Sequence, residues 1–228
     1  MDQSLKDTLM GVSVATLATA LYKRGLRNQV IQGVHPVGWK GRNMVGPAFT
    51  LRYIPAREDR NQLTEFRNPE HPQRVAVETC PEGHVLVMDS RKDARAASAG
   101  DILVTRLQMR GVAGVVTDGG FRDAAVIADL EIPAYHARPS SPTNLTLHEA
   151  YDLNVPIGCG DAPVFPGDII VGDGDCVIVL PAHLAEEIAE EAAQMTAYED
   201  FVVEKVKEGT PIIGLYPQTK PEFATEFE

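Results

Sequence analysis

Three short apolar runs, separated by two helical patterns, constrain the fold of this 228-residue chain more than any other feature. The apolar runs occupy residues 85–89, 112–116 and 132–135, and the patterns between them predict helices over residues 99–110 and 123–130. Strands that alternate with helices at this spacing form βαβ units, whose strands are parallel. We therefore predict an α/β fold with a parallel component in its sheet.

The flanking segments predict further elements. The periodicity of residues 4–24 predicts a helical segment in two pieces, and the alternation over residues 45–53 predicts a half-buried strand. Gly- and Asp-rich turns within residues 155–180 predict antiparallel strands, and a long acidic helix is predicted over residues 184–207. Residues 56–73 are polar and predict a surface segment that is partly helical.

Composition excludes several classes of protein. The length and the hydrophobic fraction of 44% predict one domain over residues 1–228. A net charge of -11 argues against nucleic-acid binding, which needs a basic face. No apolar run reaches membrane-spanning length, so no membrane partner is expected. Three cysteines without a CxxC motif favour the reducing cytoplasm.

The pair Arg122-Asp123 is the strongest candidate for a functional site. It follows a predicted strand and Gly119-Gly120, and ligands of open α/β folds collect at the carboxyl ends of strands. An arginine there can bind a carboxylate through two hydrogen bonds, and an aspartate can hold a hard divalent cation. A solvated surface pair has the same local sequence, so the pair alone leaves both interpretations open.

A second candidate is the GDIL segment, which lies where a loop should enter a helix. It consists of Gly100, Asp101, Ile102 and Leu103. Free backbone N–H groups at a helix start can bind a carboxylate, although the local pattern alone favours a simple cap with Asp101 as the N-cap. Combined with Arg122, this helix start could hold the two ends of one small anion.

The array GDIL followed by RGVAGVVTDGGFRD resembles the aldolase family related to the regulator of ribonuclease activity A. That family has an Asp, twenty intervening residues and then Arg-Asp, and residues 102–121 separate Asp101 from Arg122 here. GPAFTL at 46–51 and FPGDIIVGDGDCVIVLP at 165–181 extend the resemblance over most of the chain. The resemblance implies a single-domain α/β sandwich of the swivelling β/β/α type. A mixed sheet, a C-terminal helix at the subunit interface, and a homotrimer or dimer of trimers are also implied.

The resemblance also implies a role for each candidate residue. The backbone N–H groups of residues 100–103 would bind the carboxylate of a pyruvoyl group, and Arg122 would contact its keto oxygen and stabilise an enolate. Asp101 would position Arg122 or a metal-bound water. Asp123 would anchor Mg²⁺ or Mn²⁺, and Glu199 from a neighbouring subunit is the candidate for a further ligand.

The implied activity is that of a metal-dependent class II pyruvate aldolase. Such a lyase cleaves a 4-hydroxy-2-oxo acid to pyruvate and an oxo compound, and decarboxylation of oxaloacetate is the expected side activity. Two alternatives stay open: a lyase or hydrolase for a 2-oxo acid derived from a sugar acid, and a non-catalytic regulator that binds an RNA-degrading endonuclease. The intact set of Asp101, Arg122 and Asp123 favours an enzyme. We expect residues 57–73 to help select the aldehyde or ketone half of the substrate.

Overall fold

The computed structural model describes residues 1–227, and a mixed sheet of nine strands forms its centre. The order is β1–β14–β13–β3–β4–β6–β8–β2, and β10 pairs with β3 off that path. The bounds are β1 (Val30–Ile31), β2 (His35–Pro36), β3 (Met44–Pro55), β4 (Val85–Asp89), β6 (Gly114–Thr117), β8 (Ala134–His136), β10 (His148–Leu153), β13 (Ile169–Gly172) and β14 (Val177–Leu180). Strands β3, β4, β6 and β8 are parallel neighbours, which confirms the predicted α/β fold with a mixed sheet.

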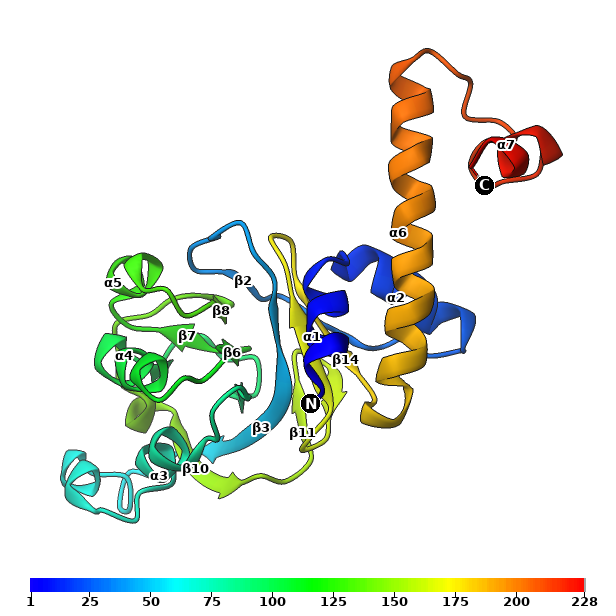
Figure 1. The fold of residues 1–228 in the computed structure, drawn as a ribbon. Helices are drawn as coiled ribbons and strands as arrows, with labels where there is room; N and C mark the ends of the chain where they lie inside the picture. Colours follow the sequence, from blue (N-terminus) through cyan, green and yellow to red (C-terminus); the bar gives the residue numbers. More distant parts are fainter. Residues whose placement is uncertain (228) are drawn as a thin grey trace.

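Strand β3 belongs to both halves of this sheet. Its residues 44–47 pair antiparallel with β13, and its residues 48–52 pair in parallel with β4. Its last residues pair antiparallel with β10. In Figure 1, β3 accordingly runs as one long curved strand between the parallel half, with α4 and α5, and the antiparallel half, with α1 and α6. The predicted antiparallel region is confirmed by β13–β14 and by the hairpin of β11 (Ile157–Cys159) and β12 (Ala162–Val164).

The helices cover the outer faces of the two halves. Their bounds are α1 (Gln3–Met10), α2 (Val14–Lys23), α3 (Pro72–Thr79), α4 (Asp101–Met109), α5 (Ala124–Asp129), α6 (Ala185–Lys207) and α7 (Pro221–Phe227). Leu86 of β4 packs with Leu107 of α4 and Ile127 of α5, whereas its neighbours in β4 face the opposite side of the sheet. Val171 of β13 packs with Ile188 of α6 in a separate core. Alternate strand residues thus supply different cores, as the pleat of a strand requires.

A small parallel sheet lies beside the main one and corrects one sequence prediction. It contains β5 (Ala97–Ala99), β7 (Gly120–Phe121) and β9 (Arg138–Pro139). The helix predicted from residue 99 begins at Asp101, because the residues before it pair with β7. Gly119-Gly120 follows the predicted strand, since β6 ends at Thr117, and Gly120 starts β7. Strands this short show no periodicity in the sequence and form through pairing with their neighbours.

The predicted acidic helix over residues 184–207 is present as α6 and extends away from the sheet (Figure 1). Arg24, the C-cap residue of α2, is ion-paired with Glu187 and Glu191 of α6, which fixes the near half of this helix. At the far half, α7 folds back so that the rings of Tyr198 and Phe227 lie 5.2 Å apart. No helix within residues 1–227 is long and apolar enough to cross a membrane.

The polar segment before α3 and two other connections contain short 3-10 helices. These are η1 (Leu63–Arg67), η2 (Asn144–Thr146) and η3 (Ala182–Leu184). Helix η1 confirms the prediction that residues 56–73 are partly helical.

A close backbone approach leaves room only for glycine at position 46 of β3. A methyl group there would lie 2.4 Å from the carbonyl oxygen of Gly83. We expect Gly46→Ala to lower the free energy of unfolding by about 1–3 kcal/mol, because the strand and the turn must separate. The control is Gly158→Ala in β11, where a methyl group meets nothing within 4 Å. Urea unfolding followed by circular dichroism measures both, and equal midpoints for the two variants would contradict this account.

Candidate functional site

A pocket of about 650 Å³ opens between the start of α4, the small sheet and the segment that carries η1 and α3. This volume suits a small organic ligand. The predicted site residues that line it are Gly100, Asp101, Ile102, Leu103, Arg122 and Asp123. The remaining wall comes from β5, η1, η2 and the first turn of α3. The two segments singled out in the sequence therefore meet at one pocket.

The register of the small sheet explains why these segments meet. Ala99 of β5 and Phe121 of β7 are paired in parallel, so Gly100 and Arg122 leave the ends of neighbouring strands. The backbone N–H of Arg122 donates to the carbonyl of Ala99 over 2.9 Å. A methyl group at Gly100 would lie 3.3 Å from Oδ2 of Asp123, so the two segments are in near contact. The chain between Asp101 and Arg122 forms α4 and β6, which connect the paired strands β5 and β7. The spacing of these two residues is thus the length of that connection.

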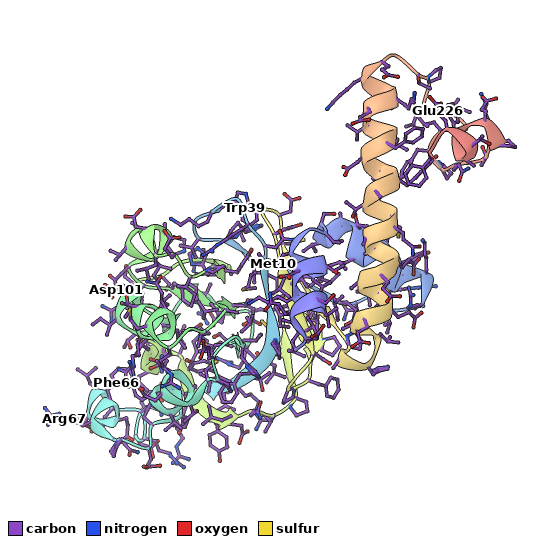
Figure 2. All side chains as sticks on the ribbon, viewed as in Figure 1. Met10, Trp39, Phe66, Arg67, Asp101 and Glu226 are labelled. Atoms are coloured by element: carbon purple, nitrogen blue, oxygen red, sulfur yellow. The ribbon has the colours of Figure 1, made fainter. Side chains whose placement is uncertain are left out.

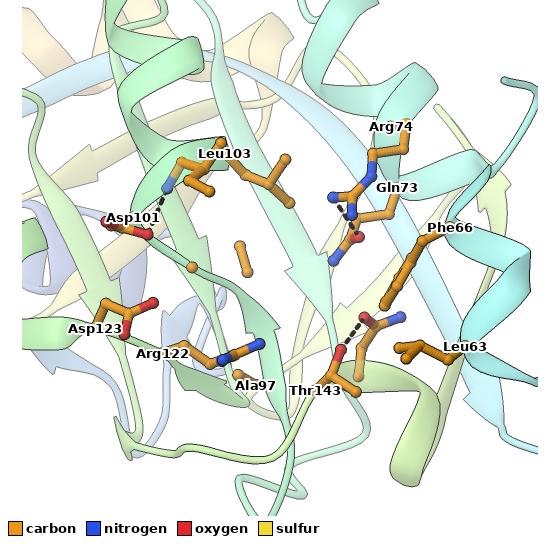
Figure 3. A pocket seen from close by; sticks show the side chains of 14 residues that line it. Leu63, Phe66, Gln73, Arg74, Ala97, Asp101, Leu103, Arg122, Asp123 and Thr143 are labelled. Atoms are coloured by element: carbon orange, nitrogen blue, oxygen red, sulfur yellow. Dashed lines mark hydrogen bonds between the residues drawn. The ribbon is translucent and has the colours of Figure 1, made fainter. Parts of the chain in front are cut away.

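Asp123 adopts a left-handed backbone conformation, with φ of 54° and ψ of 35°. Most residues with a Cβ atom disfavour this region, although Asp tolerates it better than most. Asp123 is also the N-cap residue of α5, yet within residues 1–227 its carboxylate caps no backbone N–H of that helix. The carboxylate faces the pocket beside Asp101 instead (Figure 3). The strained backbone therefore directs an acidic group toward the cavity.

Asp101 is the first residue of α4, and Gly100 is its N-cap, so the expected cap role of Asp101 is wrong. The Oδ1 atom of Asp101 accepts a hydrogen bond from the backbone N–H of Ile102 over 2.8 Å. An extended glycine fits the position before the helix because the neighbouring strand end leaves little room for a side chain. The helix start at the pocket is thus formed by backbone and one acidic side chain.

The side chain of Arg122 extends into the pocket between Ala97 and Thr143 (Figure 3). Among the ion pairs of the described residues, none includes Arg122, whereas Arg106 of α4 is bound to Glu78 over 2.9 Å. The solvated Arg122-Asp123 ion pair that the sequence left open is therefore not formed. The Arg122 guanidinium is available to an anionic ligand.

The opposite wall contains Leu63, Phe66 and Gln73, which belong to the residues 57–73 expected at the substrate, and Arg74, which lies just beyond that range. Gln73 is buried, and its Nε2 donates to the carbonyl of Ser98 and to the hydroxyl of Tyr53. Its Oε1 accepts a hydrogen bond from Nη1 of Arg74 over 3.2 Å. The Arg74 guanidinium lies 4.7 Å from the ring centroid of Phe66 in η1. The sequence signal for Arg74 itself is a polar pair in the first turn after Pro72, and this pair has no specific spacing.

The acidic side chains at the pocket determine whether the implied metal fits. Within the described residues, no three His, Cys, Asp or Glu side chains are placed to hold a metal together. Asp101 and Asp123 lie on one wall, and Mg²⁺ typically binds through one or two carboxylates while keeping several waters. The donor set therefore fits a hydrated Mg²⁺ or Mn²⁺ and does not form a closed cage.

Glu199, the other proposed ligand, does not line the pocket of its own chain. It lies on α6, where it accepts hydrogen bonds from the hydroxyls of Thr16 and Tyr216. Figure 2 shows Asp101 and Phe66 on one side of the molecule and Glu226, beyond α6, at the other. A role for Glu199 at the metal concerns a neighbouring subunit and stays a prediction.

The fold and the pocket match known proteins. The RraA-like family, described as Aldolase/RraA, matches residues 14–179. In Halalkalibacterium halodurans, a protein named "Putative 4-hydroxy-4-methyl-2-oxoglutarate aldolase" is 32% identical over 59% of this chain and 63% of its own, so less than two thirds of that relative is matched. A protein of the same name in Ectopseudomonas mendocina is 30% identical over 69% of this chain and 90% of its own.

A solved structure supports the match to this family. Streptomyces coelicolor RraAS2, described as an unusual member of the RNase ES inhibitor RraA protein family, has a TM-score of 0.78 and 29% identity. The match covers 88% of this chain and 96% of that one. The molecule is thus an α/β protein of the RraA fold. The chain belongs to the RraA-like family.

His136, at the end of β8, packs against β7, the strand that precedes Arg122. Its ring lies 5.5 Å from that of Phe121, and burial, followed by the charge of His35, lowers the pKa of His136 to about 4. The unfolded histidine takes up a proton near pH 6.5, so folding loses stability as the pH falls from about 6.5 to 4. We expect His136→Phe to remove roughly 2–3 kcal/mol of this loss. Urea unfolding between pH 7 and 4 measures it, and unchanged pH dependence in the variant would refute the assignment.

Proposed function

We propose that this protein is a divalent-metal-dependent class II pyruvate aldolase, which cleaves a 4-hydroxy-2-oxo acid to pyruvate and an oxo compound. The observation that carries the proposal is the convergence of the α4 start, Arg122 and Asp123 on one pocket. The aldolase names of relatives at 30% and 32% identity support it. Decarboxylation of oxaloacetate is proposed as a side activity, because it passes through the same pyruvate enolate.

The chain's own residues supply the binding of the 2-oxo acid. The backbone N–H groups at the start of α4 bind the substrate carboxylate, because the first N–H groups of a helix have no partner within it. Arg122 donates to the keto oxygen and stabilises the negative charge that develops there when the C3–C4 bond breaks. Arg122 thus acts most strongly on the enolate, which is the condition for acceleration of the chemical step.

The acidic wall supplies the proton transfer and the metal site. Asp101 accepts the proton of the C4 hydroxyl through a water molecule, and it returns that proton by the same route to C3 of the enolate, which gives pyruvate. Asp123, with Asp101 beside it, would hold Mg²⁺ or Mn²⁺. When bound, the cation supplies Lewis-acid polarisation of the keto and carboxylate oxygens. The assembly proposed for this reaction is a homotrimer or a dimer of trimers, in which Glu199 of a neighbouring subunit approaches the cation.

Two other functions remain as alternatives to the aldolase. The same pocket could serve a lyase or hydrolase that acts on a 2-oxo acid derived from a sugar acid. The description of RraAS2 as a member of an RNase inhibitor family supports a regulator that binds an RNA-degrading endonuclease. A panel of 4-hydroxy-2-oxo acids, assayed for pyruvate, separates the first alternative from the aldolase. Co-purification with the endonuclease, tested in parallel with an Arg122 variant, separates the second.

Removal of the Arg122 guanidinium is expected to abolish most of the activity without unfolding the protein. We expect Arg122→Ala to lower kcat by about 10²–10³-fold, because it removes a donor to the developing oxyanion. Arg106→Ala, on the exposed face of α4, is the matched control and should retain activity. Pyruvate release coupled to lactate dehydrogenase measures both variants. Wild-type turnover in Arg122→Ala would exclude the proposed role.

Metal dependence is the second test of the proposal. Chelation should abolish pyruvate release, and added Mg²⁺ or Mn²⁺ should restore it. We expect Asp123→Asn to need at least about tenfold more metal for half-maximal activity, since it loses a charged ligand. Titration of the chelated enzyme with each cation measures this requirement. Full activity in the chelator, with metal-free protein confirmed by elemental analysis, would disprove metal dependence.

A further inference from the structure

Strand β5 contains a β-bulge at the pocket, in which Ser98 is the extra residue. Its neighbours on either side pair with Gly120 and Phe121, which are consecutive residues of β7. A bulge bends its strand and changes the direction in which the following residues leave the sheet. The residues that follow β5 are Gly100 and the first turn of α4. The bulge therefore determines where the N–H groups at the start of α4 lie relative to Arg122.

The carbonyl of the bulged residue is bound from two other elements of the fold. The hydroxyl of Tyr53, on β3, donates to the Ser98 carbonyl over 2.9 Å, and Nε2 of Gln73, on α3, donates to the same oxygen. Tyr53 and Gln73 are only 1% and 3% exposed, so water does not replace these donors. A buried carbonyl without a hydrogen bond would cost about 1–3 kcal/mol. The bulge is thus held both by the main sheet and by the opposite wall of the pocket.

The hydroxyl of Ser98 connects the bulge to the segment that leads to Arg122. Ser98 Oγ lies 2.6 Å from Oγ1 of Thr117, the last residue of β6, and both side chains are fully buried. The backbone N–H of Gly119 donates to the same Thr117 oxygen over 2.9 Å. A methyl group at Gly119 would lie 2.7 Å from Ser98 Oγ, so the two segments are in close contact. The bulge and the turn before β7 are therefore held together.

This buried polar network favours one geometry of the pocket more than it stabilises the fold. Each buried hydrogen bond contributes little net free energy, whereas a fully bonded network specifies a single arrangement. The groups that need a fixed arrangement are the α4 start and Arg122, which follow β5 and β7. Their separation must match that of the carboxylate and keto oxygens of one ligand, and a misplacement of about 1 Å can lower a rate about 10²-fold.

We propose that Ser98 and Tyr53 are positioning residues, which fix the distance between the α4 start and Arg122 so that one 2-oxo acid contacts both. The inference rests on the proposed function for the identity of this ligand. Ser98 and Tyr53 are buried, and the pocket is lined by their neighbours, among them Ala97 and Gln73 (Figure 3). They act through the backbone of β5 and its pairing with β7, without contact to the ligand.

Binding of pyruvate and propanoate tests the inference without turnover. Both are three-carbon carboxylates, but only pyruvate has the keto oxygen that Arg122 contacts. Tyr53→Phe removes the hydroxyl that holds the Ser98 carbonyl and keeps the buried ring. We expect it to weaken the binding of pyruvate roughly 5–20-fold and that of propanoate less than about twofold, since only pyruvate needs both groups in register. Ligand-observed NMR titrations in Mg²⁺ measure the two dissociation constants.

Three further variants separate positioning from stability. Ser98→Ala removes the other anchor and should give the same selective loss of pyruvate binding. In an Arg122→Met background, Tyr53→Phe should leave the pyruvate affinity unchanged, because the contact that it misplaces is already lost. Tyr135→Phe is the matched control. The Tyr135 hydroxyl also donates to a backbone carbonyl, that of Asp173, over 2.8 Å, but in a different core. This variant should lose stability, measured by urea unfolding, and keep both affinities.

The outcomes distinguish this inference from the aldolase proposal. Equal weakening of both ligands in Tyr53→Phe and Ser98→Ala, or an unchanged ratio of their affinities, would overturn the positioning role, as would a wild type that binds pyruvate no better than propanoate. Metal-dependent cleavage with an unchanged kcat in both variants would retain the aldolase and reject the role. Selective loss of pyruvate binding in a protein that cleaves no 4-hydroxy-2-oxo acid would support the role and reject the aldolase.

Discussion

The pairing of β3 with strands on both of its edges is the constraint on which the rest of the structure depends. Its first residues hold the antiparallel strand β13, and the following residues hold the parallel strand β4. One continuous strand therefore joins two structural halves whose helices pack in separate cores. Gly46 lies two residues before Ala48, where the pairing with β4 begins, and it packs against the backbone of the turn before β4. A displacement there would shift the parallel strands relative to the antiparallel ones.

The functional pocket depends on a much smaller unit, the pairing of β5 with β7. This pairing brings Gly100 beside Asp123 although a full crossover separates them in the chain. The geometry is fixed by backbone hydrogen bonds and not by ion pairs, so the side chains of Arg122 and Asp123 remain available to a ligand. The buried ring of His136 packs behind β7 on Phe121 and holds this strand in place. Rigid backbone thus presents unpaired charge, as preorganised stabilisation of an oxyanion requires.

The sequence predicted the elements whose residues bury a regular face, such as β4, α6 and the parallel arrangement of the strands. It also predicted that residues 100–103 and Arg122-Asp123 meet, because their spacing matches that of a known family. It did not predict the small sheet, since strands of two or three residues have no detectable period. Nor did it predict Arg74, whose place at the pocket results from the ring of Phe66 and from Gln73, which Tyr53 and Ser98 hold. Periodic patterns in a sequence indicate which residues are buried. The polar contacts that position Arg74 join different segments and produce no such pattern.

The two walls of the pocket differ in how they are built, and this difference suggests a division of roles. Arg122 follows a strand, so its position is set by the sheet register, which a single side-chain substitution changes little. Arg74 depends on the η1 segment, an exposed polar connection in which Phe66 supplies one of its two supports. Surface connections tolerate sequence change far better than paired strands do. Changes in η1 can therefore reshape the opposite wall of the pocket, while the pairing of β5 with β7 keeps Arg122 in place.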